Sequence, residues 1–244
     1  MPQLYVAILT HNALEYTRRC LSSVARHTPP SNRVFVLDNG STDGSPEWLS
    51  SRAGLNVILS PSNLGVPAGR NLLIYEIVRS SDDGFLIFLD NDVEVSEGWC
   101  EPFLKLFAER PEVGIAGPVG HRIIVHDDTR ELLPSPESAP EPVDVVSGFC
   151  FWVRTEAVHA VGLFDETLGP FWHEDDDYCI RALHLGYEVY AAPEAPVAHH
   201  AHKSGAAEDA GLQEASKQNQ RYLAEKWRKL GCVGDDGRII RGGH

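Results

Sequence analysis

Two aspartates one position apart, Asp90 and Asp92, are the residues of this chain with the clearest chemical use. They follow the apolar run 84–89, which is typical of a strand buried on both faces. Alternate side chains of an extended segment point to the same side, so both carboxylates would face one way and Asn91 the other. Ligands of open α/β sheets bind at the carboxyl ends of the strands. Carboxylates held there predict a divalent-cation site that binds a phosphate.

Two plainer interpretations exist for this pair of carboxylates. An acidic turn in solvent would have the same composition, and the motif alone leaves that interpretation open. A calcium loop of the EF-hand type is excluded, because Val95 stands where that loop needs glycine.

A second group of acids, residues 174–177, stands where a helix is expected to begin. The helix dipole stabilises carboxylates at that end, and Asp177 with Arg181 has the spacing of an i,i+4 ion pair. Four consecutive acids exceed what helix capping requires. One of them could therefore act as a general base that takes a proton from an attacking hydroxyl group.

Three histidines within four residues, His199, His200 and His202, form a further cluster. A cluster favours metal coordination over the structural role that is usual for a single histidine. Imidazole suits zinc better than manganese or magnesium, so zinc stays an alternative metal.

The hydrophobic pattern predicts the elements that position these groups. In the first half, apolar runs alternate with amphipathic stretches, which predicts a parallel sheet with helical, right-handed crossovers. The expected strands are 4–9, 33–37, 56–59 and 84–89, and the expected helices are 13–26, a short one ending near 51 and one ending near 79.

The second half has a less regular pattern. Residues 126–143 carry four prolines, which predicts a mobile surface loop without regular structure. The other expected elements are strands at 145–153 and 187–191, helices at 155–160 and 174–185, and a polar helical tail at 206–230.

Composition limits the class of protein. A length of 244 residues suits one domain, and a net charge of −14 argues against nucleic acid or an anionic membrane as a partner. No apolar run approaches the roughly 18 residues of a transmembrane helix, and we expect no secretory signal. Five scattered cysteines without a CxxC motif suit a reducing cytosol.

Glycine-rich phosphate loops are missing from the sequence. Residues 9–15, after the first expected strand, contain no glycine, and no GxxxxGK[ST] motif occurs. NAD sites and P-loop ATP sites need such loops, because backbone N–H groups cradle the phosphates there. A bound diphosphate would therefore need a cation at Asp90 and Asp92.

Seven segments, in this order, resemble the family 2 glycosyltransferases of the GT-A fold over about residues 5–204. They are residues 10–12, 38–43, 63–65 with Arg70 and Asn71, 89–92, 162–166, 174–178 with Arg181, and His199 with Ser204. The resemblance implies a single α/β domain, 1–244, with one Rossmann-like, mostly parallel sheet flanked by helices. Within it, residues 1–119 would bind the nucleotide sugar, 120–205 would form an elaborated acceptor and catalytic half, and 206–244 a C-terminal helical tail.

The resemblance also implies roles for matching residues. Asp38 would accept the N3–H of uracil or thymine, although it could also open an Asx turn. Arg70 would meet base or phosphate, with a surface ion pair as the alternative, and Asp43 would brace its loop. The residues implied to bind the nucleotide sugar are Thr10, Asn12, Asp38, Asn63, Arg70, Asp90 and Asn91.

For the cation, Mn²⁺ or Mg²⁺, the resemblance implies Asp92 as a direct ligand, Asp90 as a residue shared with the ribose, and one histidine. The spacing before Ser204 favours His199 as this histidine and places His200 second. His202 is not excluded.

In the second half the resemblance implies Asp175 as general base. Glu174 and Trp172 would lie on the acceptor side, Asp177 would be a brace, and Trp152 is expected in the core.

Together these features predict an inverting glycosyltransferase. It would move a sugar from a nucleotide diphosphosugar, UDP-linked in preference to dTDP-linked, to a hydroxyl group of a carbohydrate or other acceptor. A cytoplasmic location is expected, with peripheral contact to the inner membrane face and a homodimer both left open.

Two alternatives remain. Haloacid dehalogenase-like sugar phosphatases carry a DxD motif on their first strand, whereas three strand–helix units precede Asp90 here. A non-catalytic nucleotide-sugar-binding module would not need every expected acidic position to be filled.

Overall fold

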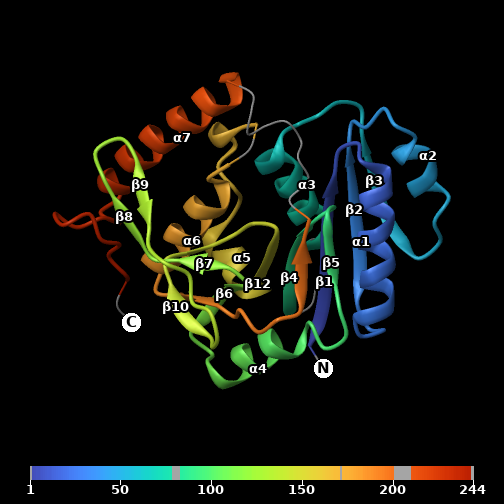
Figure 1. Cartoon of the computed structure of the whole chain (residues 1–244), viewed down its shortest axis with the longest axis horizontal. Helices are drawn as coiled ribbons and strands as arrows, with labels where there is room; N and C mark the ends of the chain where they lie inside the picture. Colours follow the sequence, from blue (N-terminus) through green and yellow to red (C-terminus); the bar gives the residue numbers. More distant parts are fainter. Residues whose placement is uncertain (1, 79–82, 171, 201–209, 243–244) are drawn as a thin grey trace.

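A mixed eight-stranded sheet forms the centre of the chain in this computed structural model (Figure 1). The structure describes residues 2–78, 83–170, 172–200 and 210–242. The strand order is β10-β13-β6-β12-β4-β1-β2-β3. These strands are β1 (Gln3–Thr10), β2 (Arg33–Asn39), β3 (Leu55–Ser60), β4 (Gly84–Asp90), β6 (Val113–Gly117), β10 (Glu141–Val143), β12 (Cys150–Arg154) and β13 (Glu188–Ala191).

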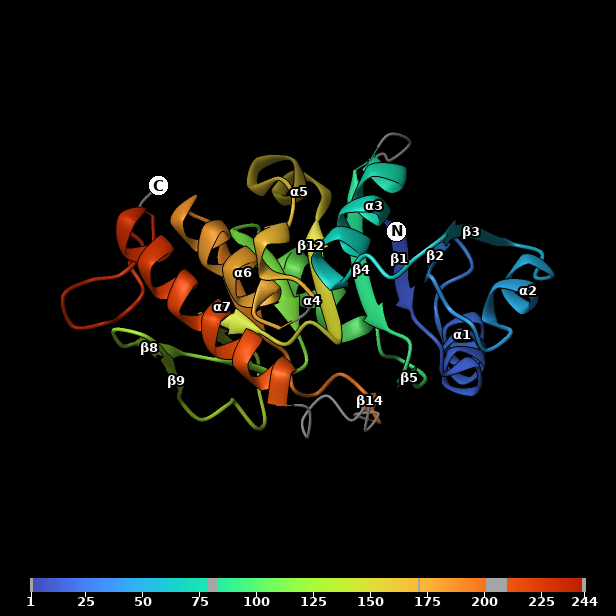
Figure 2. The same cartoon turned by 90° about the horizontal axis from the view of Figure 1, so that it is seen from above.

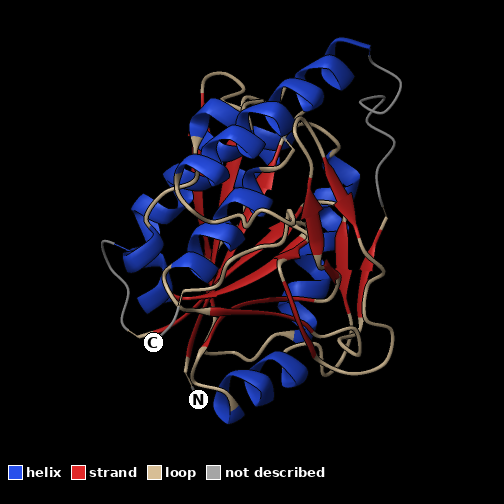
Figure 3. Ribbon diagram, turned by 90° about the vertical axis from the view of Figure 1, so that its left-hand side faces the viewer, coloured by secondary structure: helices blue, strands red, loops and turns tan. Residues whose placement is uncertain are grey.

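Helices cover both faces of this sheet (Figures 2 and 3). One face packs against α3, α5, α6 and α7, and the other against α1, α2 and α4. Their bounds are α1 (Leu14–His27), α2 (Ser45–Ser50), α3 (Val66–Val78), α4 (Glu101–Glu109), α5 (Thr155–Val161), α6 (Glu174–His184) and α7 (Ala210–Lys229). Within the described residues, no helix has both the length and the apolar character needed to cross a bilayer.

Strand β4 shows why its sequence is apolar at consecutive positions. Leu86 and Phe88 point into one hydrophobic core, and Phe85, Ile87 and Leu89 point into the other. A strand between two helical layers buries both sets of side chains, so its run is continuous rather than alternating. The predicted α/β class with helices on both faces is confirmed.

The first half follows the predicted parallel arrangement, and the second half makes the sheet mixed. Strands β4, β1, β2 and β3 pair in parallel. Strand β12 lies antiparallel between β4 and β6, and β10 pairs antiparallel with β13 at the edge. Helix α4 and strand β6, which were not predicted from the sequence, carry the chain past the position of β12.

The prediction that residues 126–143 lack regular structure is wrong. β8 (Ile123–Val125) pairs with β9 (Arg130–Leu132), and β10 closes the edge of the main sheet. Pro142 is compatible with β10 because the outer side of an edge strand needs no N–H donor.

The single strand expected at 145–153 is broken in two. β11 (Val145–Val146) pairs with β7 (Gly120–His121), and β12 begins again at Cys150. The interruption at 147–149 borders the end of β4, because the Asp90 N–H donates to the Phe149 carbonyl over 2.9 Å.

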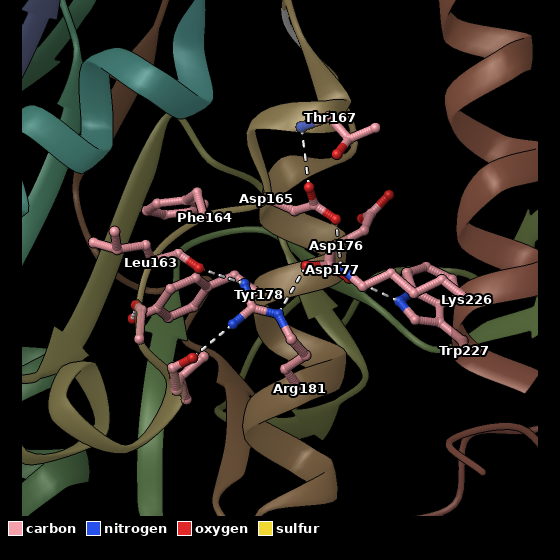
Figure 4. A network of polar contacts seen from close by, with 12 residues as sticks. Leu163, Phe164, Asp165, Thr167, Asp176, Asp177, Tyr178, Arg181, Lys226 and Trp227 are labelled. Atoms are coloured by element: carbon pink, nitrogen blue, oxygen red, sulfur yellow. Dashed lines mark hydrogen bonds and ion pairs between the residues drawn. The ribbon is translucent and has the colours of Figure 1, made fainter. Parts of the chain in front are cut away.

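A polar network around Asp177 docks α7 against α6 (Figure 4). Asp177 is fully buried and accepts hydrogen bonds from Arg181 Nε (2.8 Å) and Trp227 Nε1 (3.2 Å). Lys226 Nζ lies 2.7 Å from Asp177 and 2.7 Å from Asp165, which links the two carboxylates. The predicted pairing of Asp177 with Arg181 is confirmed, and Asp177 is a structural brace.

We predict that Asp177→Asn destabilises the protein by about 3 kcal/mol, because removing one member of a buried ion pair leaves uncompensated charge. Chemical denaturation at neutral pH measures this. The matched control is Asp235→Asn at an exposed position, which should leave the free energy of unfolding within about 0.5 kcal/mol of wild type. Equal stabilities of the two variants would contradict the assignment.

Candidate active site

Three predicted ligands meet at the carboxyl end of β4. One ligand atom each from Asp90, Asp92 and His199 lie within 4.8 Å of one another. β5 (Val93–Val95) pairs antiparallel with β14 (Val197–His199), and this pairing sets His199 opposite the residue that follows Asp92. His199 Nε2 lies 3.3 Å from Asp92 Oδ1. Two carboxylates and an imidazole form a donor set suited to a divalent cation such as Mn²⁺.

Asn91 is separated from the two aspartates as predicted, although residues 91–92 form a turn and not an extended segment. Asn91 points away from the cation site, and its Nδ2 donates to the hydroxyls of Thr10 and Thr17, each over 3.1 Å. Thr10 is fully buried and lies 2.8 Å from Thr17. Thr10 and Asn91 therefore fix the first strand against the DxD segment in this structure.

His199 carries the electrostatic signature of a ligand position. A hydrogen bond with Asp92 raises the pKa of His199 above its ordinary value, although partial burial opposes the shift. The ring also stacks on Phe149, with centroids 4.4 Å apart. Because a protonated imidazole cannot bind metal, protons and a cation compete for this residue.

His200, the second candidate, does not join this cluster. His200 Nε2 lies 2.6 Å from Glu94, which also pairs with Arg19. His202 lies outside the described residues.

Asp38, the penultimate residue of β2, has one carboxylate oxygen with a hydrogen bond and one without. It is 1% exposed, and Oδ1 accepts the Ser41 N–H over 3.0 Å, as in an Asx turn. The other oxygen, Oδ2, is buried and has no hydrogen-bond partner. A buried acceptor left without a donor costs free energy, so this oxygen is available to a donor group of a ligand.

Asn12, Asp43 and Asn63 shape the loops around Asp38. Asn12 Oδ1 accepts the Thr42 N–H (2.8 Å). Asp43 accepts the N–H of Leu14 (2.9 Å), which confirms it as a brace. Asn63 Oδ1 accepts the N–H of Gly65 over 2.9 Å, which closes its turn.

Arg70 is buried rather than at the surface. Its guanidinium lies 5.5 Å from the ring centroids of both Phe88 and Phe164, which contact each other edge to face. Nη1 lies 3.1 Å from Glu174 Oε1, and Nη2 lies 3.4 Å from Asp90 Oδ1. This residue joins the cation site to the start of α6.

The four acids that open α6 have different surroundings. Glu174 contacts Arg70, Asp176 contacts Arg130 and His173, and Asp177 belongs to the network described above. These three are buried, whereas Asp175 is partly exposed. Asp175 Oδ2 accepts the Gly148 N–H over 2.7 Å, and Oδ1 accepts the Asp176 N–H over 3.0 Å.

Burial and like charge shift the pKa values of this cluster. Burial, followed by the charge of Asp176, raises the pKa of Asp175. Burial and the charge of Asp175 raise the pKa of Glu174 to about 8. For Asp176, burial would raise the pKa, but Arg130 and His173 lower it overall. Asp175 thus combines accessibility with increased basicity, as a general base requires.

The two tryptophans differ in position. Trp152 is fully buried and stacks on Phe103 with centroids 4.8 Å apart, which confirms its predicted place in the core. Trp172 is partly exposed just before α6, and its carbonyl accepts a hydrogen bond from Asn219 (3.3 Å).

Sequence reasoning missed Gly148, Phe149 and Arg130. Gly148 interrupts a run that otherwise predicts a strand, and an isolated glycine there indicates close approach of another group. No local pattern marks Phe149 or Arg130, whose contacts are with residues far away in sequence.

Comparisons with known proteins agree with this geometry. Residues 5–161 match the family described as glycosyl transferase family 2. An N-acetylglucosaminyl-diphospho-decaprenol L-rhamnosyltransferase of Mycobacterium tuberculosis is 26% identical over 92% of this chain and 86% of its own length.

Among solved structures, GalNAc-T7 with UDP, GalNAc and Mn²⁺ superposes with a TM-score of 0.68 at 16% identity, over 82% of this chain and 43% of that one. Mannosyltransferase PcManGT from Pyrobaculum calidifontis, in complex with GDP-Man and Mn²⁺, gives a TM-score of 0.63 at 16% identity, over 96% and 76% of the two chains. At these identities the superpositions show the GT-A fold.

We predict that Asp92→Asn weakens Mn²⁺ binding by at least about tenfold, because it removes the charge of one of three converging ligands. Isothermal titration with MnCl₂ measures the affinity. Glu97→Gln, an exposed change a few residues along the chain, is the control and should bind Mn²⁺ as wild type does. Unchanged affinity of Asp92→Asn would place the cation elsewhere.

Proposed function

The chain belongs to glycosyl transferase family 2, and from this premise we propose that it is an inverting enzyme that uses a divalent cation and a nucleotide diphosphosugar. Family and relatives make it a sugar-transferring enzyme, which replaces the phosphatase and non-catalytic alternatives. The arrangement that carries the proposal is one accessible carboxylate, Asp175, which is linked through the backbone of Gly148 and the side chain of Arg70 to the converging set Asp90, Asp92 and His199.

In the proposed reaction, Asp175 takes the proton from an acceptor hydroxyl group as its oxygen forms a bond to C1 of the donor sugar. The bond from C1 to the diphosphate breaks in the same step, and the nucleoside diphosphate leaves with the electron pair. A cation at Asp90, Asp92 and His199, Mn²⁺ or Mg²⁺, would act as a Lewis acid toward the diphosphate. Displacement from the face opposite the leaving group inverts the configuration at C1.

The donor base is proposed to be uracil, with thymine as the second candidate. Asp38 Oδ2, buried and without a partner, supports this, because both bases present an N3–H donor at neutral pH. The remaining predicted nucleotide-side residues, Thr10, Asn12, Asn63 and Asn91, would act by shaping the loops that surround the base and ribose.

The sugar and acceptor are proposed from the relative that covers nearly the whole chain. Its name specifies L-rhamnosyl transfer to N-acetylglucosaminyl-diphospho-decaprenol, so L-rhamnosyl nucleotides and polyprenyl-diphosphate acceptors belong in the first assay panel. Trp172 and Glu174 would lie on the acceptor side. A cytoplasmic location at the inner membrane face and a homodimer stay predictions.

Asp175→Asn tests the general base. We expect kcat to fall by about 10²–10⁴-fold, because the amide cannot take the proton. Release of UDP or dTDP from a panel of donors and acceptors measures turnover, and calorimetry with UDP and Mn²⁺ should show wild-type affinity. The control is Asp83→Asn, an exposed change at the opposite end of β4. Wild-type turnover by Asp175→Asn would refute the role.

Asp38→Asn tests recognition of the base. Cytosine lacks an N3–H and carries an N3 acceptor, so wild type should bind UDP more tightly than CDP. We expect the variant to lose about tenfold or more in UDP affinity, the value of roughly one hydrogen bond to a charged group. Its side-chain amide can donate to cytosine, so the preference for UDP should shrink or reverse. An unchanged UDP-to-CDP ratio in calorimetry would exclude the contact.

A further inference from the structure

The backbone of Gly148 lies between two charged residues of the site, Asp175 and Arg70. Its N–H donates to Asp175 Oδ2 over 2.7 Å, and its carbonyl accepts from Arg70 Nη2 over 2.9 Å. Gly148, in the segment between β11 and β12, therefore binds Asp175 through its N–H and Arg70 through its carbonyl.

There is no room for a side chain at this position. A Cβ on Gly148 would lie 2.9 Å from both Nη atoms of Arg70 and 3.1 Å from Asp175 Oδ2. Arg70 cannot easily yield, because it is 2% exposed, packs against two aromatic rings and is paired with Glu174. A methyl group would therefore push Asp175 aside or break its hydrogen bond.

The next residue, Phe149, makes the corresponding contacts with the cation site. Its carbonyl accepts the Asp90 N–H over 2.9 Å, and its ring stacks on His199 at an interplanar angle of 14°. Two consecutive residues thus contact the general-base side and the cation side of the same site.

We propose that Gly148 is a positioning residue for catalysis, which holds the Asp175 carboxylate at a fixed place relative to Arg70 and the cation site. This inference rests on the proposed function, since it takes Asp175 as the base. Gly148 acts through its N–H, and because it has no side chain it leaves room for Asp175 and Arg70. The next residue, Phe149, orients His199, the proposed cation ligand.

The hydrogen bond from Gly148 also sets the charge state of Asp175. Glu174 and Asp176 from its own helix and Arg70 from α3 are the charged groups that face Asp175. The Gly148 N–H stabilises the ionised carboxylate, so loss of this bond raises the pKa of Asp175. A base with a higher pKa becomes protonated at a higher pH, so the acid limb of the pH–rate profile moves to higher pH.

Gly148→Ala is the test, with the donor and acceptor pair that wild type turns over. We expect kcat to fall by about 10- to 100-fold, the effect of displacing a reacting group by a fraction of an ångström to one ångström. The acid limb of kcat should move to higher pH, while KM for the donor and the affinity for Mn²⁺ with UDP stay within about twofold. Gly211→Ala, at an exposed helix position, is the control for adding a methyl group and should match wild type.

Phe149→Leu is expected to affect the cation side of the site and not the general base. It removes the ring that stacks on His199 but leaves the Gly148 peptide in place, so Mn²⁺ affinity should fall while the acid limb stays where it is in wild type. The same change in both variants would show general loosening of the segment and overturn the assignment.

Folding is checked by circular dichroism and thermal denaturation. If Gly148→Ala does not fold, Arg70→Lys is the second test of the positioning role. Lysine keeps the positive charge but not the hydrogen-bond geometry at the Gly148 carbonyl. We expect a lower kcat and the same shift of the acid limb. Wild-type kcat and acid limb in the folded variant, with Asp175→Asn inactive, would overturn the positioning role and leave the proposed function standing. Full activity of Asp175→Asn would instead remove the proposed function itself.

Discussion

The buried guanidinium of Arg70 is the interaction on which the geometry of the site depends. The chain has a net charge of −14, and the site gathers carboxylates from β4 and from the start of α6. Such groups repel one another in a poorly solvated region unless a positive charge lies between them. Arg70 contacts Asp90 on one side and Glu174 on the other, so it allows both acidic segments to approach. The aromatic rings of Phe88 and Phe164 hold the guanidinium in that place.

The acids of α6 show how neutralisation selects one residue for chemistry. Asp176 is paired with Arg130 of β9, and Asp177 with Arg181 and Lys226, the latter from α7. Within the part of the chain that the structure describes, the hydrogen bonds to Asp175 come from the backbone N–H groups of Gly148 and Asp176, and among the four acids Asp175 is the one that solvent reaches. The charges that distinguish Asp175 from its neighbours therefore come from Arg130, inside the matched residues 5–161, and from Arg181 and Lys226, outside them.

The sequence was sufficient where local rules decide the structure. The prediction that Asp90 and Asp92 lie together with Asn91 pointing elsewhere agrees with the structure, although residues 91–92 form a turn; the preference for His199 over His200 came from the family resemblance. The sequence failed where distant segments decide: the strands β5 and β14, three residues each, carry no periodic signal, yet their pairing brings His199 to the cation site. In the sequence, Arg70 could be recognised as no more than a charged residue near the start of a helix. Its burial depends on Phe164, which lies far along the chain.

The loop after β1 gives a structural argument for the proposed use of a cation. In folds that bind a diphosphate at the first helix, free backbone N–H groups at the helix N-terminus face the phosphates. Here the N–H of Leu14, at the start of α1, is already bonded to Asp43, which places a carboxylate where those folds place an anion. A diphosphate at that helix end would meet negative charge. The converging ligands at the end of β4 offer the alternative, because a divalent cation there reverses the sign of the local field. The Asp43 brace and the candidate cation site thus fit one arrangement, in which the proposed cation and not the first helix would meet the charge of a diphosphate.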